Sequence, residues 1–240
     1  MPKIDTAVFL AAGLGSRLKG LSKDKPKGFL EIKGKSLIEL SVNKLLDAGI
    51  KQLFFGTGYL SEVYEDFARK YNAKCIKNEI FANTGSMYTL YNMRNLINTD
   101  FLLLEADLLY DKSGLNALLN DEHSDAILAS GKTNSKDEVF IETDAQSNLI
   151  NMSKNHALLK SIDAELVGIS KVSEFTYRKM CSFAETQFKH NPKLDYEYVF
   201  VELAKKQKLF VQKIEDYVWC EIDDEHHYHR ALETISPLIQ

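Results

Sequence analysis

Glycines and cationic side chains gather in one short segment near the N-terminus, and together they could bind a polyphosphate. Gly13 and Gly15 leave backbone N–H groups open to an anion, and Arg17, Lys25 and Lys27 follow closely. Backbone amides, an arginine fork and lysine charges are the groups that bind phosphates in proteins. A G-x-G pair standing alone is typical of a tight turn, so this interpretation depends on the cations beside it. The combination predicts a cradle for a triphosphate.

The spacing in this segment excludes two common phosphate-binding motifs. The dinucleotide-binding fingerprint has a third glycine where this chain has Leu18. A P-loop needs Gly-Lys followed by Ser or Thr after four intervening residues, and the segment contains no such sequence. The sequence therefore does not indicate a dehydrogenase or a P-loop kinase.

Carboxylates occur after one of the apolar runs and again near the C-terminus. Glu105 and Asp107 follow the apolar run 101–104, separated by Ala106, and Asp223 lies near the C-terminus. Mg²⁺ prefers carboxylate oxygens, and Mg²⁺ with Lys and Arg side chains supplies most of what phosphoryl transfer needs. Each aspartate also has an alternative structural role, because a strand-end Asp often forms a turn and Asp223 or Asp224 could cap the helix that follows.

The apolar pattern predicts alternating strands and helices in the first part of the chain. Short apolar runs that end in glycine or acidic residues are typical of buried parallel strands, and residues between them recur at helical spacing. The pattern predicts an α/β fold: a Rossmann-like, mostly parallel sheet with helices on both faces, which binds ligands outside the carboxyl ends of its strands. The expected strands are 6–12, 52–55, 73–76 and 101–104, and the expected helices are 36–49, 61–71 and 86–97.

The pattern changes after Gly131. Shorter sheet-forming pieces at 139–143, 149–152 and 166–170 are expected to form a small lid insertion over the site, with helices at 173–188 and 196–205. No repeat or linker separates the two parts. We expect a single domain of residues 1–240, with a nucleotide-binding core at 1–130 and an acceptor-binding part with the lid at 131–240.

Composition and charge limit the partners and the compartment of the protein. The 240 residues carry a net charge of −4, which argues against electrostatic binding of nucleic acid or of an anionic membrane. No stretch approaches the ~18 apolar residues of a membrane span, and three cysteines without a Cys-x-x-Cys pair indicate reduced thiols in the cytoplasm. His226, His227 and His229 lack the spacing of a metal site, so a solvated helix start is expected there. Trp219 is expected to pack in the core.

The segment from Leu10 to Leu30 resembles the signature of the sugar-phosphate and choline-phosphate nucleotidyltransferases, LAAGxGSRLxxLTxxxPKxLL, with Ser22 at the usual threonine. The resemblance implies a fold of the nucleotide-diphospho-sugar transferase type and Mg²⁺-dependent activation of a triphosphate. By this resemblance Lys27 neutralises charge at the α-phosphate, Arg17 holds the β- and γ-phosphates, and Asp107 with Asp223 binds Mg²⁺. The implied nucleotide contacts are Leu10, Ala12, Gly13, Gly15, Ser16, Arg17, Gly58, Ser86, Thr89, Glu105 and Ala106.

Three further segments resemble the smaller cytidylyltransferases that use CTP to activate amino-alkyl phosphates. They are GSMYTL at 85–90, ELVGISK at 165–171 and DYEY at 195–198. The resemblance implies that the acceptor contacts Asp137, Glu138, Val139, Lys154, Tyr196 and Glu197. Tyr196 and Glu197 could instead lie on a helix whose aromatic side faces the core, and Lys154 could be an exposed lysine.

Val139 and the nearby carboxylates favour a primary ammonium group in the acceptor. Val139 stands where the phosphocholine enzymes have a tryptophan that helps to cage a trimethylammonium group, whereas a primary ammonium prefers to donate hydrogen bonds to carboxylates. We therefore expect transfer of CMP from CTP to 2-aminoethylphosphonate, with release of pyrophosphate. The alternatives are phosphocholine or a sugar 1-phosphate as acceptor, and a nucleotide-sensing module without catalysis. A fused or partner domain beyond Gln240 is also compatible with the sequence.

Overall fold

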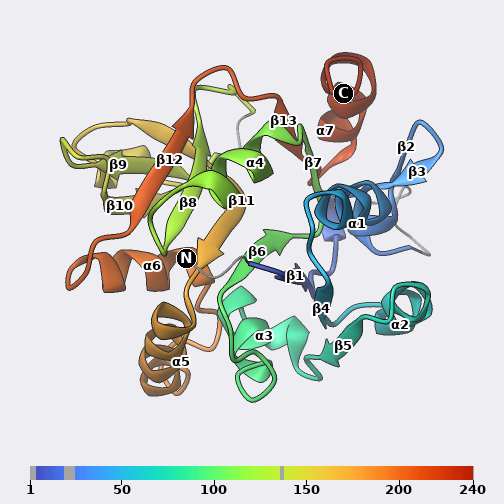
Figure 1. The fold of residues 1–240 in the computed structure, drawn as a ribbon, viewed down its shortest axis with the longest axis horizontal. Coiled ribbons are helices and arrows are strands. Elements are labelled where there is room, and N and C mark those ends of the chain that lie inside the picture. The colour runs from blue at the N-terminus through green and yellow to red at the C-terminus, as the bar shows by residue number, and fades with distance from the viewer. Residues whose placement is uncertain (1–3, 19–24, 136–137, 240) are drawn as a thin grey trace.

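The first strand, β1 (Thr6–Ala11), shows why this chain folds into three layers. Alternate side chains of a strand point to opposite faces of a sheet. Val8 packs into the core on one face, while Ala7 and Phe9 pack into the core on the other. A strand with two apolar faces needs helices on both sides. The computed structural model describes residues 4–18, 25–135 and 138–239, and in them a sheet lies between two helical layers (Figure 1).

A nine-stranded mixed sheet forms the centre of the molecule. Besides β1 it contains β4 (Gln52–Thr57), β5 (Lys74–Lys77), β6 (Phe101–Glu105), β8 (Ala126–Ser130), β9 (Phe140–Thr143), β10 (Leu149–Ser153), β11 (Ala164–Val172) and β12 (Phe210–Ile214). The order along the sheet is β10-β9-β11-β6-β1-β4-β5, and β8 pairs with both β11 and β12. Strands β6, β1, β4 and β5 are parallel. The expected α/β fold with a mostly parallel nucleotide-binding half is confirmed.

Strand β11 lies in the centre of the sheet, although the sequence pattern predicted only a short piece of a lid at 166–170. All nine of its residues are buried, and it pairs with β8 on one side and with β6 and β9 on the other. The predicted strand was too short, because β11 continues through the polar residues Glu165 and Lys171 at its two ends. Both side chains are buried in the fold. Through the pairing of β6 with β11, the two expected parts of the chain share one sheet.

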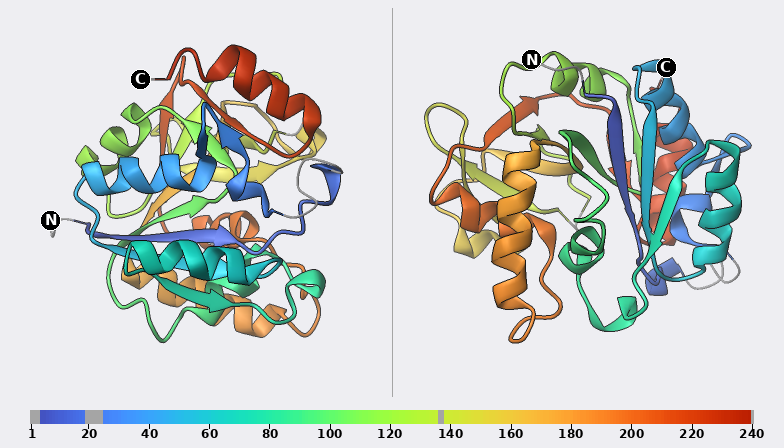
Figure 2. Two further views of the ribbon diagram at one scale, coloured as in Figure 1. Left: turned by 90° about the vertical axis from the view of Figure 1, so that its right-hand side faces the viewer. Right: turned by 60° about the horizontal axis from the view of Figure 1, so that its bottom comes forward.

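Two helical layers bury the two faces of the sheet. Helices α1 (Leu37–Asp47), α2 (Ser61–Lys70) and α4 (Ser113–Asn120) pack on the face that contains Phe9, and α1 and α2 face the reader in the left view of Figure 2. Helices α3 (Ser86–Asn92), α5 (Glu174–Gln187) and α6 (Tyr196–Ala204) pack on the other face. Ser36 caps α1, accepting a hydrogen bond from Glu39 N. None of the helices in the described ranges has the length and apolar character needed to cross a bilayer.

Helix α3 ends at Asn92, although its apolar pattern was expected to continue as a helix to residue 97. Turns follow directly: Met93 N donates to Leu90 O and Arg94 N donates to Tyr91 O, both at 3.1 Å. The later apolar residues of the pattern, Met93 and Ile97, still pack into the core. Their spacing therefore reflected burial rather than helical conformation. Helix α4 and strands β8 and β12 were not predicted at all.

A third apolar cluster joins the N-terminal loop to the C-terminal end of the chain. It includes Leu18, Leu30, Ile222 and Ile235. The elements around it are two small sheets, β2 (Glu31–Ile32) with β3 (Lys35–Ser36) and β7 (Leu108–Tyr110) with β13 (Trp219–Glu221), and α7 (Glu225–Arg230) with its π-helical continuation (Ala231–Ile235). Short 3₁₀ turns lie at Ser16–Leu18, Lys27–Phe29, Phe81–Asn83 and His156–Leu158. This cluster holds Leu18 and Leu30 against the segment that contains Asp223.

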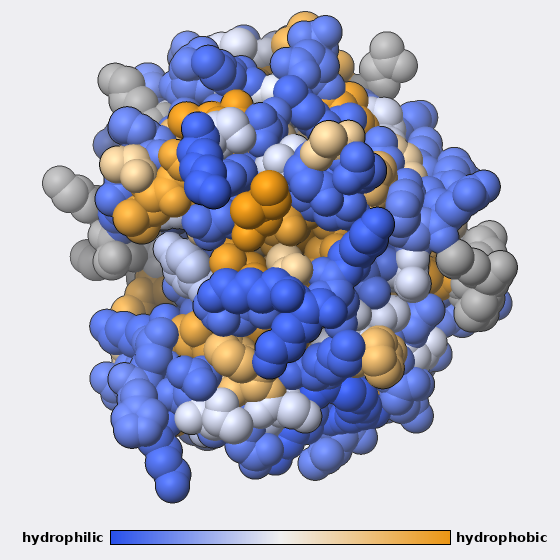
Figure 3. Space-filling view, turned by 90° about the vertical axis from the view of Figure 1, so that its left-hand side faces the viewer, coloured by the Kyte–Doolittle hydropathy of each residue, from blue (hydrophilic) through white to orange (hydrophobic). Residues whose placement is uncertain are grey.

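The face of the molecule nearest β9, β10 and α6 has apolar side chains grouped among hydrophilic ones (Figure 3). Ile150 and Leu158 are 45% and 66% exposed, and together with Tyr198 they border a hollow of about 750 Å³. β10 is an edge strand of the main sheet. This hollow does not include the residues predicted for nucleotide binding.

Gly58, directly after β4, packs closely against the loop that follows β1. A Cβ at this position would lie 2.7 Å from Ala12 O and 2.7 Å from Phe81 Cγ. Because a backbone oxygen cannot move without moving the loop, we expect Gly58→Ala to lower the free energy of unfolding, measured by urea denaturation, by about 1–3 kcal/mol. Gly13→Ala is the control, since a Cβ there meets nothing within 4 Å. Equal stability of the two variants would contradict the close approach at Gly58.

Candidate active site

A cavity of about 370 Å³ opens at the carboxyl ends of β1 and β6. This is the edge of the sheet at which parallel α/β proteins bind ligands. Leu10 and Glu105 contribute from the two neighbouring strands, and Ser86 contributes from the start of α3. Eleven residues that the sequence predicted for the site line it: Leu10, Ala12, Gly13, Ser86, Thr89, Glu105, Asp107, Glu138, Val139, Lys154 and Glu197.

Lys27 and Arg17 form an ion cluster with two aspartates at this edge. Lys27 Nζ donates to Asp107 Oδ2 at 3.2 Å and also to Asp223 Oδ1. Arg17 Nη2 donates to Asp223 Oδ2 at 2.7 Å. Burial by itself lowers the pKa of Lys27, but Asp107 and Asp223 outweigh burial and hold this pKa above its ordinary value. Lys27 is therefore a fixed positive charge at neutral pH, held in place by two carboxylates.

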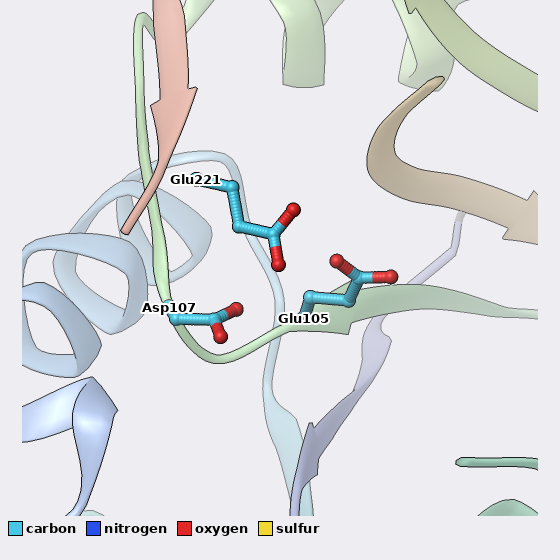
Figure 4. Close-up of side chains that lie close together, drawn as sticks. All are labelled: Glu105, Asp107 and Glu221. Carbon is cyan, nitrogen blue, oxygen red and sulfur yellow. The ribbon is translucent and has the colours of Figure 1, made fainter. Parts of the chain in front are cut away.

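Three carboxylates converge beside this cluster. Oxygens of Glu105, Asp107 and Glu221 lie within 4.8 Å of one another, and Figure 4 shows the side chains pointing toward one another from β6, the following turn and β13. Burial, and then repulsion from Asp107, raises the pKa of Glu105 to about 8. The same two causes raise the pKa of Glu221 well above its ordinary value. The carboxylates repel one another, and the neighbouring cations do not cancel that repulsion.

This group of carboxylates fits a divalent cation. A bound cation would relieve the repulsion that the raised pKa values of Glu105 and Glu221 report, and carboxylate oxygens are ligands that Mg²⁺ accepts. The predicted pair of ligands was Asp107 and Asp223. Asp107 belongs to the group, whereas Asp223 pairs with the two cations and its part in metal binding stays a prediction. Glu221 was not predicted as a metal ligand. Its position two residues before Asp223, which was predicted, could have indicated it.

The glycine loop runs beside these charges. Gly15 has φ 63°, a left-handed conformation that glycine adopts without strain, and Leu18 N donates to Gly15 O at 3.1 Å to close the turn that carries Arg17. Ala106 packs in the core, with its N–H donating to Leu10 O, so its predicted contact with a nucleotide has no support in this geometry. The side chain of Ser16 lies outside the described part of the structure, as does Ser22. Lys25, expected in the phosphate cradle, pairs with Glu31 at 3.1 Å instead.

Ser86 and Thr89 line the cavity from α3, and each is hydrogen-bonded within the protein. Asp195 Oδ1 accepts from Ser86 N at 2.9 Å and from Ser86 Oγ at 3.0 Å. Tyr196 N in turn donates to Ser86 Oγ at 3.0 Å. Asn78 Nδ2 donates to Thr89 Oγ1 at 3.0 Å. The first turns of α3 and α6 are therefore tied together, and the nucleotide contacts of Ser86 and Thr89 stay predictions.

Tyr196 and Glu197 have different surroundings on α6. Tyr196 is 1% exposed, and its hydroxyl donates to Glu105 Oε1 at 2.7 Å. Its ring packs edge-on against Phe200 in the core, so the expected aromatic contact with an acceptor has no support in this geometry. Glu197 lines the cavity, and burial, followed by repulsion from Asp195, raises the pKa of Glu197 to about 7. Tyr196 instead supports a carboxylate of the acidic group.

The segment after Gly131 supplies another wall of the cavity. Glu138 and Val139 line it, and Val139 also packs against the core. Lys154, directly after β10, lines it with an exposed side chain. Asp137 lies outside the described residues. The acceptor contacts predicted for Glu138, Val139 and Lys154 stay predictions, made by side chains that reach the cavity.

Three further residues of the lining, Trp219, His227 and Arg230, were missed. His227 was expected in a solvated helix start, but it is 6% exposed, so that prediction was wrong for this histidine. Asp224 accepts a hydrogen bond from His227 N at 2.8 Å and so caps α7, which turns the His227 side chain inward. Trp219 packs in the core as expected and also borders the cavity. The available signal was helical spacing, because His227 and Arg230 are three residues apart and share one helical face.

Fold and site together define the class of the protein, which is a nucleotidyltransferase. The family model described as "MobA-like NTP transferase domain" matches residues 7–168, and the chain belongs to this family. The match covers the glycine loop, Lys27, the acidic turn at Asp107 and most of β11. Asp223 and α7 lie beyond it.

Curated relatives match nearly the whole chain. The chain is 26% identical over 239 residues to the choline-phosphate cytidylyltransferase of Haemophilus influenzae, covering 96% of this chain and 97% of that protein. It is 26% identical over 240 residues to the CTP:phosphoglutamine cytidylyltransferase of Campylobacter jejuni, covering 90% and 95%. A 2-aminoethylphosphonate cytidylyltransferase of Lancefieldella rimae is 28% identical over 119 residues, covering 49% of this chain and 45% of that protein.

Solved structures share the fold. An inositol-1-phosphate CTP transferase from T. maritima superimposes with a TM-score of 0.82 at 17% identity, covering 99% of this chain and 98% of that one. The CTP:phosphocholine cytidylyltransferase from Streptococcus pneumoniae also gives 0.82, at 24% identity, covering 96% and 99%. At these identities the likeness concerns the fold alone. It confirms the fold of the nucleotide-diphospho-sugar transferase type that the sequence predicted.

Tyr196 could contact the acceptor through its ring or support Glu105 through its hydroxyl, and replacing it with phenylalanine separates these two roles. The ring would remain for any contact with an acceptor, while the hydrogen bond to Glu105 would be lost. We expect Tyr196→Phe to lower kcat about tenfold, which corresponds to one hydrogen bond to a carboxyl group, with little change in KM for the acceptor. Pyrophosphate release measures both constants. Tyr198→Phe is the control, because Tyr198 lies on the same helix and is 41% exposed; an equal effect of both variants would argue against the role of the Glu105 contact.

Proposed function

We propose that the protein transfers CMP from CTP to 2-aminoethylphosphonate, with Mg²⁺ as the metal ion and CMP-aminoethylphosphonate and pyrophosphate as the products. The observation that carries this proposal is the position of Glu197. This carboxylate, suited to an ammonium group, lines the same cavity as Asp107 and Glu221, where the triphosphate would be activated. One cavity could therefore hold both reactants. The choice of cytosine rests on the resemblance and on the relatives named as cytidylyltransferases.

Lys27 and Arg17 support the nucleotide half of the reaction. When an acceptor oxygen attacks the α-phosphorus, the bond from that phosphorus to the bridging oxygen breaks and pyrophosphate leaves, while negative charge is spread over the phosphoryl oxygens. Lys27, kept protonated by Asp107 and Asp223, would stabilise that charge, and Arg17 would hold the β- and γ-phosphates. Asp107, Asp223 and Glu221 would hold Mg²⁺, which neutralises phosphate charge when it is bound. Direct attack requires no protein nucleophile.

The chemistry of the acceptor wall favours a primary ammonium. A primary ammonium has three N–H donors, and Glu138 and Glu197 offer carboxylate oxygens to receive them. A trimethylammonium group has no such donor and depends on aromatic faces. Val139 occupies the position at which an aromatic face would be needed, so a small amino-alkyl phosphonate or phosphate fits this wall better.

Phosphocholine is the second candidate acceptor. Two relatives that match 96% of this chain are named choline-phosphate cytidylyltransferases, and Phe81 and Trp219 also line the cavity. These rings could provide part of an aromatic cage. A sugar 1-phosphate is the weaker alternative, because it carries no cation for Glu197.

Pyrophosphate release tests the proposal directly. The purified protein is mixed with Mg²⁺, CTP and, in parallel, 2-aminoethylphosphonate, phosphoethanolamine, phosphocholine or glucose 1-phosphate, and the same panel is repeated with ATP, GTP and UTP. We expect the highest kcat/KM for CTP with 2-aminoethylphosphonate. A higher kcat/KM for phosphocholine would replace the proposed acceptor with the second candidate. Release with a sugar phosphate alone would refute both amino-alkyl acceptors.

Lys27 provides the sharpest test of the nucleotide half. We expect Lys27→Ala to lower kcat by about 10²–10³, as the loss of one preorganised group that stabilises charge in the transition state does in other enzymes. Steady-state pyrophosphate release measures the change, and circular dichroism checks the fold. Lys25→Ala is the matched control: Lys25 is nearby in the sequence but exposed and paired with Glu31, so its variant should retain most activity. A Lys27 variant as active as the Lys25 variant would remove Lys27 from the mechanism.

Glu197 predicts a pH dependence for acceptor binding. Its pKa of about 7 reflects burial and Asp195, opposed by Lys154, and only the ionised carboxylate attracts an ammonium. As the pH falls from 8 to 6 the carboxylate becomes protonated, so KM for 2-aminoethylphosphonate should rise roughly tenfold from this group. In Glu197→Gln this contribution should vanish, leaving the pH dependence of the acceptor itself. Glu202→Gln, on the same helix and paired with Lys205, should behave as the wild type; identical profiles for all three proteins would exclude Glu197 from acceptor binding.

A further inference from the structure

Arg230 reaches the cavity from α7 with most of its hydrogen-bonding capacity unused by the described residues. A guanidinium carries five N–H donors. Within the described ranges Arg230 makes one hydrogen bond, from Nη2 to Thr133 O at a long 3.4 Å, and no ion pair. An arginine beside a cavity with no carboxylate partner is well suited to an oxyanion, which it can bind through two parallel N–H groups.

The wall around Arg230 is tied to the central sheet. Glu165 of β11, which is 3% exposed, accepts hydrogen bonds through Oε2 from Thr133 N at 2.8 Å and from Thr133 Oγ1 at 2.7 Å. One turn before Arg230, His227 Nε2 lies 3.1 Å from Ser135 O. Helix α7 is therefore linked at two points to the segment that contains Thr133 and Ser135. These contacts of α7 with Thr133 and Ser135 fix the position of Arg230 beside the cavity.

Two buried polar atoms along this wall make no hydrogen bond in the described part of the chain, although one of them, His227 Nδ1, lies 3.7 Å from Asp224 Oδ1. Trp219 Nε1 and His227 Nδ1 are both inaccessible and have no hydrogen-bond partner among the described residues. Both residues line the cavity and are more than nine-tenths buried. Buried polar atoms are normally satisfied, so unsatisfied ones beside a cavity indicate a place where a polar ligand or ordered water completes the structure. These atoms are independent of Arg230 and point to the same wall.

Charge separates this wall from the rest of the cavity. Apart from Lys154, His227 and Cys220, the other ionisable side chains of the described lining are carboxylates: Glu105, Asp107, Glu138, Asp195, Glu197 and Glu221. An ammonium group belongs among the carboxylates and an oxyanion belongs at Arg230. A small molecule that carries both charges would be oriented by this separation.

We propose that Arg230 binds the tetrahedral oxyanion of the acceptor, its phosphonate or phosphate group. This inference rests on the proposed function, since it assigns the opposite end of an acceptor whose ammonium faces Glu197. The guanidinium would hold two of the three oxygens and leave the third free to attack the α-phosphorus. A phosphonate and a phosphate monoester present the same three oxygens to Arg230, so both sources bind alike at this point.

Kinetics on the complete enzyme form the first test. We expect Arg230→Met to raise KM for both 2-aminoethylphosphonate and phosphoethanolamine at least about tenfold, while KM for CTP changes less than about twofold. Arg230→Lys, which keeps the charge but loses the fork, should give an intermediate KM. His229→Gln is the matched control, because His229 lies on the same helix with its side chain exposed. An unchanged acceptor KM in Arg230→Met, or an equal rise in KM for CTP, would overturn the assignment.

A binding experiment keeps the inference testable even if no acceptor is turned over. Trp219 is the single tryptophan of the chain and lines the same cavity, so its fluorescence reports on this wall. We expect methylphosphonate and inorganic phosphate to cause a saturable change in the wild type and in Lys27→Ala, and to cause none in Arg230→Met. Such a result without turnover would refute the proposed function and uphold the oxyanion site. The assignment of the oxyanion site to Arg230 would be overturned by any of three results. The fluorescence change could persist in Arg230→Met, be lost in Lys27→Ala, or be absent from the wild type.

Discussion

The ion pairs of Asp223 with Arg17 and Lys27 join the two ends of the chain at one point, and the rest of the site depends on them. The side chain of Asp223 is 3% exposed, and a carboxylate so deeply buried is costly unless cations pair with it. Lys27 and Arg17 would in turn repel each other without it. The apolar cluster that contains Leu18 and Ile222 brings the partners into reach. Folding of the segment around Asp223 is therefore coupled to the shape of the glycine loop that contains Arg17.

Unfavourable electrostatic interactions are concentrated at the residues where the reaction would occur. Glu105 and Glu221 have raised pKa values because burial removes water from carboxylates that already repel one another. Stability alone would favour neutral side chains at these positions. Tyr196 holds Glu105 in place from the core, and Gly168, at φ 86°, leaves room for it, since a Cβ there would lie 2.8 Å from Glu105 Oε2. Contacts from the core thus hold these carboxylates close together, and bound ligands, rather than other groups of the protein, would balance their charge.

The sequence was most informative where structure is local. Strand β1, the capped helix α1 and the glycine loop follow from patterns a few residues long, and all were predicted. Strand β11 was misjudged because Glu165 and Lys171 are polar residues that the fold buries. Glu165 is satisfied by Thr133, and Lys171 by Asp121, partners that are 32 and 50 residues away. No local pattern carries that information.

By itself, the sequence determined the class of fold and the residue types of the proposed triphosphate site, because spacing along one strand and one loop fixes which groups the backbone presents. Only the tertiary structure decided what each side chain contacts. It packed Tyr196 in the core behind Glu105, and it turned His227 and Arg230 of α7 toward the cavity. The physical reason is that orientation toward a core or a cavity depends on packing between distant segments, and those contacts exist only after the chain has folded.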